Sequence, residues 1–375
     1  MARHIAARGL EGVIAAETAL SFIDGRAGRL LYRGYDIGDL AKRGTFLEAL
    51  FLLWNDALPT RAELARFSAE LAGLGALPPA VLGVLRQLPS QAVPMAVLRT
   101  AVSVLGDSDP EQDDGSAEGT LRKSTRLVAR VPTAVAAFHR IRGGHEPIPP
   151  DDSLSYSANF LYMLNGERPG PVAEKALDTS LLLYLEHGLN ASTFTCRVIA
   201  STLSDLYSAV TGGIGALKGP LHGGANEKAM QMLIEIGEIG RVEDYIDSAL
   251  AAGRKIMGFG HRVYRTEDPR ATHLRRMSEE LGRAIGDTRW FELSRAVETT
   301  MRDRKGLDCN VDFYCASVYH CLGLPLDLYT PMFAVGRMGG WCAHVMEQLE
   351  NNRLIRPRAE YTGARDRPYV PMGER

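Results

Sequence analysis

The sequence predicts a mostly helical, all-α protein with one short β-hairpin near its N-terminus. Apolar residues recur three and four positions apart along most of the 375 residues, as they do on the buried face of a helix. Only one pair of short apolar runs flanks a turn signal that could join two strands. Strands and helices do not alternate, and the chain has neither G-x-G-x-x-G nor a Walker A sequence, which argues against a nucleotide-binding parallel sheet.

The hairpin is predicted between residues 20 and 32. Leu20 to Ile23 and Leu30 to Tyr32 are the two apolar runs, and the Asp24-Gly25 pair between them favours a tight turn. No second hairpin of this quality follows.

A capping box predicts the first clear helix. Thr45 and Glu48 stand three residues apart in front of the apolar run from Phe46 to Trp54, so each side chain can satisfy a free backbone N–H of the first turn. Apolar spacing predicts further helices over 61–73, 79–87, 93–105, 119–141, 153–166 and 171–186. The acidic segment 106–115 and the Gly/Pro-rich segment 143–150 are predicted to be surface loops.

The second half of the chain continues the helical pattern. We expect one helix whose buried face carries Ile199, Leu203, Leu206 and Val210. This helix should end at the glycine pair 212–213. Two more amphipathic helices are predicted over 242–250 and 274–285.

Composition narrows the class of protein. The net charge is -2, so the chain as a whole does not attract nucleic acid or an anionic membrane, and any anionic ligand must be held by local cations. The five cysteines form no C-x-x-C pair, which indicates free thiols in a reducing compartment. Residues 1–8 lack the apolar core of a signal peptide, and no apolar run reaches membrane-spanning length, so we expect a cytoplasmic protein.

One histidine lies between turn-forming residues. His222 stands in the stretch Lys218 to Glu227, after Gly219-Pro220 and before a glycine pair, so its imidazole should lie on a tight turn. A histidine there can exchange protons near neutral pH. Considered alone, the stretch fits an ordinary connection between two helices equally well.

A second glycine-flanked histidine favours a functional role for both. His261 follows Gly258 and Gly260, whose backbone N–H groups we expect to be free for a ligand. Nearby cations are Lys255, Arg262, Arg265 and Arg270. This composition is typical of an anion site, and a solvated basic loop is the alternative.

Asp312 is a candidate general base. Asn310 has the features of a helix N-cap, which puts Asp312 in the first turn, where the helix dipole stabilises a carboxylate by roughly 0.3–1 kcal/mol. Its apolar neighbours would also let it face a partly apolar cleft, where a base is useful. Arg337 and Arg356 are further candidates for an anion site, because guanidinium groups bind carboxylates through two hydrogen bonds.

These residues favour acid–base chemistry over two other classes. His222, His261 and Asp312 lie far apart in sequence, with no H-x-x-x-H or H-E-x-x-H cluster, so we expect no metal ion. A G-x-S-x-G nucleophile motif does not occur. Proton transfer at a carbon or carbonyl centre, beside a bound small anion, remains.

Together, the motifs resemble those of the citrate synthase family. The matching pieces are residues 187–194, 218–227, 258–270 and 310–314, with 32–37 near the N-terminus and 356–358 near the C-terminus. They stand in the family's order and spacing, so the resemblance covers nearly the whole chain.

The resemblance implies a homodimer of two-domain helical subunits. The large domain would comprise residues 1–221 and 326–375, with the dimer contacts and the oxaloacetate site. The small domain, 222–325, would bind coenzyme A and carry the catalytic aspartate. The implied reaction condenses acetyl-CoA with oxaloacetate and water to citrate and CoA through an enol and citryl-CoA, with no cofactor beyond the thioester substrate.

The resemblance also implies a role for each site residue. His222 would hydrogen-bond the thioester carbonyl, Asp312 would remove a methyl proton, and His261 would polarise and protonate the ketone. The oxaloacetate ligands would be His187, Arg270, Arg337 and Arg356, the last from the other subunit. For coenzyme A we expect Lys255, Gly258, Phe259, Gly260, Arg262 and Lys305.

Two positions depart from the family pattern. Val93 stands where relatives often have histidine, and Asp308-Cys309 replaces Tyr-Pro ahead of Asn310. The second change affects a loop that would position Asp312 or touch coenzyme A. It makes Cys309 a candidate thiol modulator, with an inert loop cysteine as the alternative.

Three other functions remain open at this point. A 2-methylcitrate synthase would use propionyl-CoA with the same groups, and one methyl group separates the substrates by only roughly 1–3 kcal/mol. A non-catalytic helical ligand sensor would keep the pocket without turnover. A metal-dependent lyase would lose activity on chelation.

Overall fold

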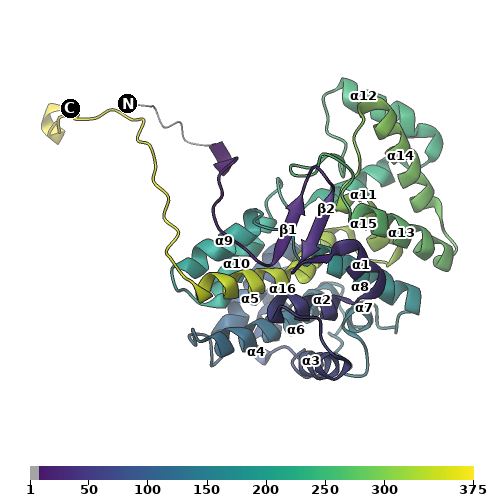
Figure 1. Ribbon diagram of the computed structural model, residues 1–375, viewed down its shortest axis with the longest axis horizontal. Coiled ribbons are helices and arrows are strands. Elements are labelled where there is room, and N and C mark those ends of the chain that lie inside the picture. Colours follow the sequence, from purple (N-terminus) through teal and green to yellow (C-terminus); the bar gives the residue numbers. More distant parts are fainter. Residues whose placement is uncertain (1–7) are drawn as a thin grey trace.

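The computed structural model describes residues 8–375 and confirms the all-α prediction with a small N-terminal sheet. These residues form sixteen α-helices and one three-stranded sheet (Figure 1). Residues 1–7 lie outside the described part. They belong to the predicted large domain and make up most of the segment considered above for a signal peptide.

The sheet contains the predicted hairpin and one added strand. β1 (Ser21–Asp24) pairs antiparallel with β2 (Arg29–Tyr32), which pairs with the two-residue β3 (Tyr35–Asp36). Tyr32 is fully buried, and its hydroxyl donates to the carbonyl of Glu186 at 2.9 Å. The sheet is therefore anchored beside the segment that follows α8.

The helices of the first half lie where the sequence predicts them. They are α1 (Ile37–Arg43), α2 (Phe46–Asn55), α3 (Arg61–Gly73), α4 (Pro79–Gln87), α5 (Pro94–Asp107), α6 (Ala117–Arg142), α7 (Tyr156–Asn165) and α8 (Pro171–Tyr184). The capping box is present, since the Thr45 side chain accepts the Glu48 N–H and the Glu48 side chain accepts the Thr45 N–H. Only the short α1 was not predicted.

The helix predicted across 199–210 is wrong, because the chain forms two helices there. α9 (Ala191–Ser201) ends before Leu203, which has a φ of 65° and is 73% exposed, and α10 (Leu206–Leu217) then begins. Asp205 caps α10 by accepting the Ser208 N–H at 2.9 Å, and a cap of this kind competes with a continuous helix. The glycine pair 212–213 lies inside α10, where a Cβ on Gly213 would stand 2.5 Å from the sulfur of Cys196.

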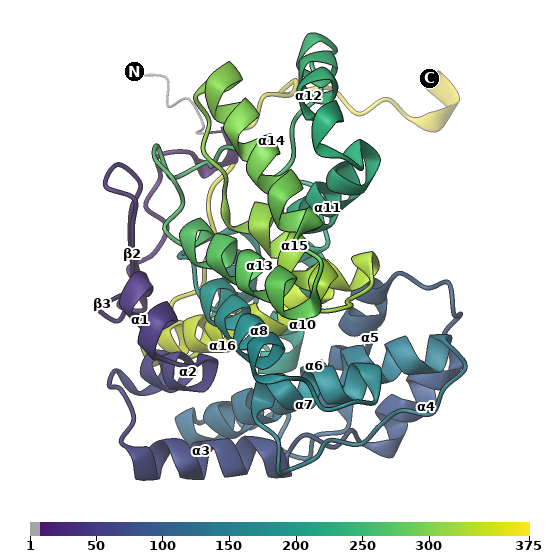
Figure 2. The same cartoon turned by 90° about the vertical axis from the view of Figure 1, so that its right-hand side faces the viewer.

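The second half forms an upper group of helices and one long buried helix. The elements are α11 (Ala225–Ile236), α12 (Val242–Ala251), α13 (Ala271–Ile285), α14 (Arg289–Lys305), α15 (Val311–Cys321) and α16 (Tyr329–Glu350). Short 3₁₀ turns lie at Arg8–Leu10, Ile239–Arg241, Leu326–Leu328 and Met372–Glu374. Figure 2 shows α11, α12 and α14 above, α3, α4, α6 and α7 at the base, and α13 and α15 between them. The predicted boundary at 222–325 separates α11–α15 from the rest and stays a prediction.

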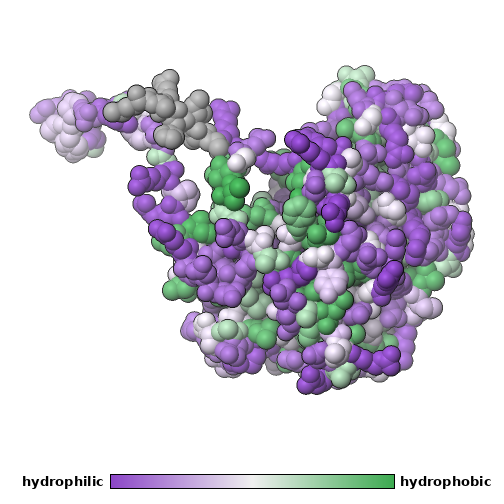
Figure 3. All heavy atoms as spheres, in the orientation of Figure 1, coloured by the Kyte–Doolittle hydropathy of each residue, from purple (hydrophilic) through white to green (hydrophobic). Residues whose placement is uncertain are grey.

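The C-terminal segment leaves the body of the protein. After α16 the chain is fixed at Ile355, whose N–H donates to the Ser201 hydroxyl at 3.0 Å. Every residue from 356 to 375 is exposed, and Figures 1 and 3 show the segment standing clear of the helices. No helix among the described residues has the length and apolar content that crossing a membrane requires.

Candidate active site

Two of the predicted histidines meet although they lie far apart in sequence. His187 follows the end of α8, and His261 lies in the loop between α12 and α13. Their ring centroids are 5.3 Å apart, and Tyr264 packs against both, at 5.5 Å from His187 and 4.7 Å from His261. The Tyr264 hydroxyl lies 3.1 Å from His187 Nε2. The two imidazoles therefore form one wall of a shared site.

The backbone fixes the tautomer of His261. Its Nδ1 accepts the N–H groups of Val263 at 2.9 Å and Tyr264 at 3.1 Å, so the proton of the neutral ring is on Nε2. Burial and the nearby Arg270 lower its pKa to about 4. At neutral pH His261 is thus an uncharged donor through Nε2.

His222 is held in the opposite tautomer. It lies on the predicted turn, between α10 and α11. Its Nε2 accepts the Ser192 N–H at 3.3 Å, which places the proton of the neutral ring on Nδ1. Nε2 also lies 2.8 Å from the Ser192 hydroxyl, which donates to Asn190 Oδ1 at 2.8 Å and accepts the indole N–H of Trp341 at 3.2 Å. Burial and Arg337 lower the pKa of His222 to about 4, so this ring is also a neutral donor.

Asp312 lies in the first turn of α15, as the sequence predicts. The Asn310 side chain caps the helix by accepting the Asp312 N–H at 3.0 Å. The Tyr184 hydroxyl, at the end of α8, donates to Asp312 Oδ1 at 2.7 Å. Burial raises the pKa of Asp312 to about 6 against the effects of Tyr184 and Arg270. A carboxylate of this kind is a stronger base than an exposed one.

Arg270 is already paired within the site. It is 3% exposed, and its Nε and Nη2 bind the two oxygens of Asp268 at 2.9 and 2.7 Å. Burial opposes its charge, but Asp268 keeps the pKa of Arg270 above its ordinary value. Asp268 also accepts the Val311 N–H at 3.2 Å. This carboxylate thereby ties the His261 loop to the start of α15.

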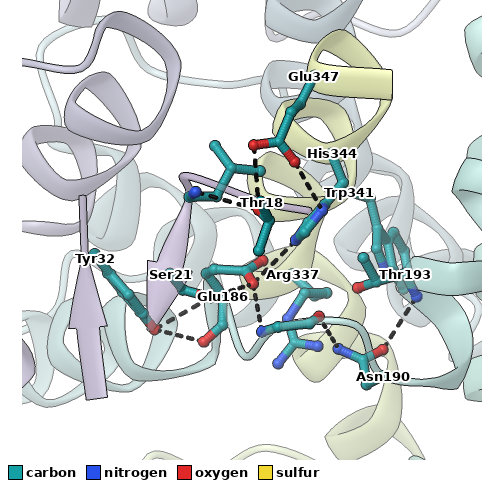
Figure 4. Close-up of polar contacts among 12 residues, drawn as sticks. Thr18, Ser21, Tyr32, Glu186, Asn190, Thr193, Arg337, Trp341, His344 and Glu347 are labelled. Atoms are coloured by element: carbon teal, nitrogen blue, oxygen red, sulfur yellow. Dashed lines mark hydrogen bonds and ion pairs between the residues drawn. The ribbon is translucent and has the colours of Figure 1, made fainter. Parts of the chain in front are cut away.

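Arg337 is a buried cation with no ion pair among the described residues. It lies on α16, is 1% exposed, and donates from Nε to the Tyr184 carbonyl at 2.6 Å. Burial lowers its pKa, and the neighbouring Arg270 acts in the same direction. Figure 4 shows Glu186 next to it; Oε1 of that carboxylate binds His344, Ser21 and the Gly188 N–H, while its buried Oε2 has no hydrogen-bond partner among the described residues. The two terminal guanidinium nitrogens of Arg337 form no hydrogen bond or ion pair with a described residue and are available to bind an anion.

The glycine loop before His261 is joined to the segment before α15. Phe259 bridges Cys309, the Gly260 N–H donates to the Asp308 carbonyl at 3.1 Å, and the Asn310 N–H donates to the Gly258 carbonyl at 2.9 Å. The expectation that Gly260 offers a free N–H is therefore wrong, because the extended loop pairs with its neighbour. Gly258 has a φ of 83°, and a Cβ there would stand 2.7 Å from Phe313, so glycine is required.

The three cations expected to bind coenzyme A lie on the surface. Lys255, Arg262 and Lys305 are exposed and form no ion pair with any residue between 8 and 375. Lys255 and Arg262 lie on either side of the glycine loop, and Lys305 is the last residue of α14. Their charge is available for phosphate groups.

Cys309 lies in a polar cluster that a guanidinium already fills. Glu267, Glu298 and Cys309 could together reach one ion, but Arg275 Nη2 binds both carboxylates and lies 3.8 Å from the Cys309 sulfur. Burial, with Glu298 beside it, raises the pKa of Cys309 to about 12. These contacts favour the inert cysteine over the thiol modulator.

A separate cavity lies at the base of the molecule. It measures about 670 Å³ and is lined by residues of α3, α6, α7 and α8, among them Ala72, Pro132, Tyr156 and Asp178. None of the predicted site residues borders it. This cavity is therefore separate from the candidate site.

Some residues of this site were not found from the sequence. Ser192 and Asp268 each stand within a matching motif, and their polar side chains near a candidate residue are a signal that could have identified them. Tyr184 has no such signal, because it ends an apolar helix and looks like a core residue. Arg356 was predicted, but it is exposed and contacts none of the other groups in this chain.

This arrangement can remove a proton beside a carbonyl group. Asp312 is a base of raised pKa, and His222 and His261 are neutral hydrogen-bond donors with fixed tautomers. Arg270 and Arg337 supply positive charge for a small anion. Donors aimed at a developing oxyanion are among the most effective catalytic groups.

Comparison with protein families gives one match along almost the entire chain. Residues 9–358 match the model of the citrate synthase C-terminal domain. The chain is 52% identical to a citrate synthase of Haloferax volcanii, over 98% of both chains, and 51% identical to citrate synthase 2 of Bacillus subtilis, over 99% of both. It is also 43% identical to a 2-methylcitrate synthase of Shewanella oneidensis, over 100% of this chain and 99% of that one.

Solved structures agree with the sequence matches. A citrate synthase of Pyrobaculum aerophilum superposes with a TM-score of 0.92 at 40% identity, covering 98% of this chain and 95% of that one. The citrate synthase of Thermoplasma acidophilum, in a ternary complex with carboxymethyl coenzyme A and oxaloacetate, gives 0.91 at 34% identity, over 98% and 99%.

Proposed function

This chain belongs to the citrate synthase family, and we propose that His222, His261 and Asp312 carry the family's reaction in it. The protein is an enzyme that condenses acetyl-CoA with oxaloacetate and water to give citrate and CoA. Two observations support the assignment of roles: His222 and His261 are neutral donors with fixed, opposite tautomers, and Asp312 is a buried carboxylate of raised pKa.

The reaction begins with loss of a methyl proton. Asp312 takes the proton from acetyl-CoA, and Nδ1–H of His222 donates to the thioester oxygen as the enol forms. If the methyl group is a weaker acid than a carboxylic acid by on the order of ten pKa units, the mismatch is at least ~14 kcal/mol. A placed donor supplies ~3–4 kcal/mol and fixed reactants ~7–11 kcal/mol, so base, donor and positioning are needed together.

Oxaloacetate is the electrophile. Arg337 and Arg270, with His187, would bind its two carboxylates, and Nε2–H of His261 would polarise its ketone. As the enol carbon attacks the ketone carbon, the enol proton returns to Nδ1 of His222 and the ketone oxygen takes a proton from Nε2 of His261. The proton that Asp312 removed restores His261, so the number of protons is unchanged. Water then cleaves the thioester of citryl-CoA, which releases CoA and citrate with no cofactor consumed.

Closure of a smaller domain, residues 222–325, over the larger one would protect the enol from water. Two contacts described above link these parts, His222 with Ser192 and Asp312 with Tyr184. Lys255, Arg262 and Lys305 would bind the phosphates of coenzyme A, while Gly258, Phe259 and Gly260 would lie along it. The Thermoplasma complex with carboxymethyl coenzyme A and oxaloacetate supports both substrates.

The working form would be a homodimer whose subunits complete each other's sites. The exposed segment 356–375 has no partner in its own chain between residues 8 and 355 on which to pack, which supports contact with a second copy. Arg356 would then supply a third arginine for oxaloacetate across the interface. We place this dimer in the cytoplasm, where the five unpaired thiols would stay reduced.

A 2-methylcitrate synthase is the second candidate, because a relative with that activity is 43% identical over the whole chain. The same groups would act on propionyl-CoA. A non-catalytic sensor is disfavoured by the full-length match to curated citrate synthases.

The deciding experiment measures CoA release with oxaloacetate and either acetyl-CoA or propionyl-CoA. We expect the higher kcat/KM with acetyl-CoA, and a clear preference for propionyl-CoA would favour the second candidate. Asp312→Ala should nearly abolish release while calorimetry still detects oxaloacetate binding. The matched control is Asp244→Ala, which removes an exposed carboxylate on α12. An unchanged rate in Asp312→Ala would refute the assignment of the base.

A further inference from the structure

Tyr184 touches three parts of the site, although no step above uses it. It is the last residue of α8 and is fully buried. Its hydroxyl donates to Asp312 Oδ1 at 2.7 Å, its carbonyl accepts the Nε–H of Arg337 at 2.6 Å, and its ring centroid lies 4.4 Å from that of Phe333. The base, the anion site and an aromatic wall therefore meet at one residue.

The hydroxyl contact controls the orientation of the carboxylate. Asn310 holds only the backbone N–H of Asp312, and no other side chain between residues 8 and 375 donates a hydrogen bond to its carboxyl oxygens. The terminal torsion of an aspartate is soft, so the carboxylate would otherwise turn freely. With Oδ1 occupied, Oδ2 is left to accept a proton.

We propose that Tyr184 is a positioning residue, whose hydroxyl holds the Asp312 carboxylate so that its free oxygen faces the acyl methyl group. This inference rests on the proposed function, because it assigns Asp312 as the base. Tyr184 binds Arg337 through its carbonyl and Asp312 through its hydroxyl. It therefore also sets the distance between the base and the arginine that would bind oxaloacetate.

The charges around Asp312 give the expected direction of a pH effect. The titratable and charged groups around it are Tyr184 from α8, Arg337 from α16, Arg270 and Asp268 from the loop before α13, and Cys315 and Tyr319 from α15. Burial raises the pKa of Asp312 most, the Tyr184 hydrogen bond is the largest opposing cause, and both arginines act with Tyr184 while Asp268 acts against it. Loss of the hydroxyl should therefore raise this pKa further.

Tyr184→Phe isolates the hydroxyl, because it keeps the ring on Phe333 and the carbonyl for Arg337. We expect kcat to fall roughly tenfold to a hundredfold, the range for losing a hydrogen bond to a charged group. The KM for oxaloacetate should stay within about twofold, since Arg337 keeps its contacts. The acid limb of the pH profile should move to higher pH.

A second buried tyrosine provides the matched control. Tyr319 on α15 is fully buried, and its hydroxyl accepts from Ser180 at 3.4 Å without touching Asp312. Tyr319→Phe should leave the acid limb in place even if it costs some stability. A shift of equal size in both variants would mean that general loosening, and not the Asp312 contact, moves the profile.

A direct titration separates this inference from the proposed reaction. The carboxyl carbon of Asp312 can be followed by NMR in protein labelled at aspartate, with Asp312→Asn to assign the signal. A higher pKa in Tyr184→Phe than in the wild type supports the inference, and an unchanged pKa together with an unchanged kcat overturns it. If the wild type releases no CoA from either thioester, the proposed function fails, while the titration still decides whether Tyr184 holds Asp312.

Discussion

Acid should inactivate the enzyme through Asp312 alone. As the proposed base, this carboxylate must be ionised to accept the methyl proton, and burial raises its pKa to about 6. The ionised fraction should be about a half at pH 6 and about a tenth at pH 5, so kcat/KM at pH 5 should be about a tenth of its plateau.

The two histidines determine the slope of that decline. Burial lowers the pKa of both His222 and His261 to about 4, so both rings are still neutral at pH 5. The slope of the acid limb should therefore be near one at pH 5. Because the neutral rings are the proposed donors, no histidine should cause a decline between pH 6 and 8.

The assay is the initial rate of thioester cleavage at low acetyl-CoA and saturating oxaloacetate, followed from pH 4.5 to 8.5 by thioester absorbance. Samples returned to pH 7 after each measurement show whether the protein stayed folded. Two results would refute this reasoning. A slope of two would mean that a histidine must also lose a proton. A rate that falls steadily from pH 6 to 8 would mean that an imidazolium is needed.

Three further predictions concern the dimer, stability and the thiol. Exchange of subunits between Asp312→Ala and Arg356→Ala proteins should restore about a quarter of wild-type activity. Half of randomly assorted dimers are mixed, and in each the subunit with Asp312 receives Arg356 from its partner, which gives one complete site of two. A mixture that stays inactive would argue against a shared Arg356. Asp312→Asn should raise the free energy of unfolding by up to about 3 kcal/mol at pH 7.5, and by much less at pH 4, since a raised folded-state pKa costs stability only where the unfolded carboxyl is ionised. Thermal melts at the two pH values measure this, and equal gains at both would contradict it. An alkylating reagent at pH 7 should spare Cys309, which is 1% exposed and has a pKa raised to about 12, and mass spectrometry showing faster labelling there than at Cys321 would count against that assignment.

The sequence was sufficient for the class of fold, and it pointed to the three residues to which we assign the chemistry. Apolar spacing placed the helices from α2 to α8 with ends within three residues, because their buried faces are unbroken. His222, His261 and Asp312 could be found because each stands beside residues that set its backbone, two glycine turns and an N-cap.

Contacts made only in three dimensions could not be predicted. Leu203 continues the apolar spacing across 199–210, so periodicity could not reveal the turn at which it is exposed. The Gly260 N–H looked free because its acceptor, the Asp308 carbonyl, lies almost fifty residues along the chain. Tyr184 was missed because a tyrosine that ends an apolar helix has the same pattern whether its hydroxyl serves packing or a carboxylate.

The pairing of the glycine loop with the segment before α15 also bears on how this family can be recombined. Gly258 and Gly260 exchange hydrogen bonds with Asp308 and Asn310, and Phe259 packs on Phe313 at 4.6 Å. A loop transplanted from a relative to change the acyl-CoA preference would have a shape that fits the relative's segment before α15. It would not fit the segment before α15 in this chain. The unit to exchange is therefore the two segments together, 255–263 with 306–313, although the sequence separates them by two helices.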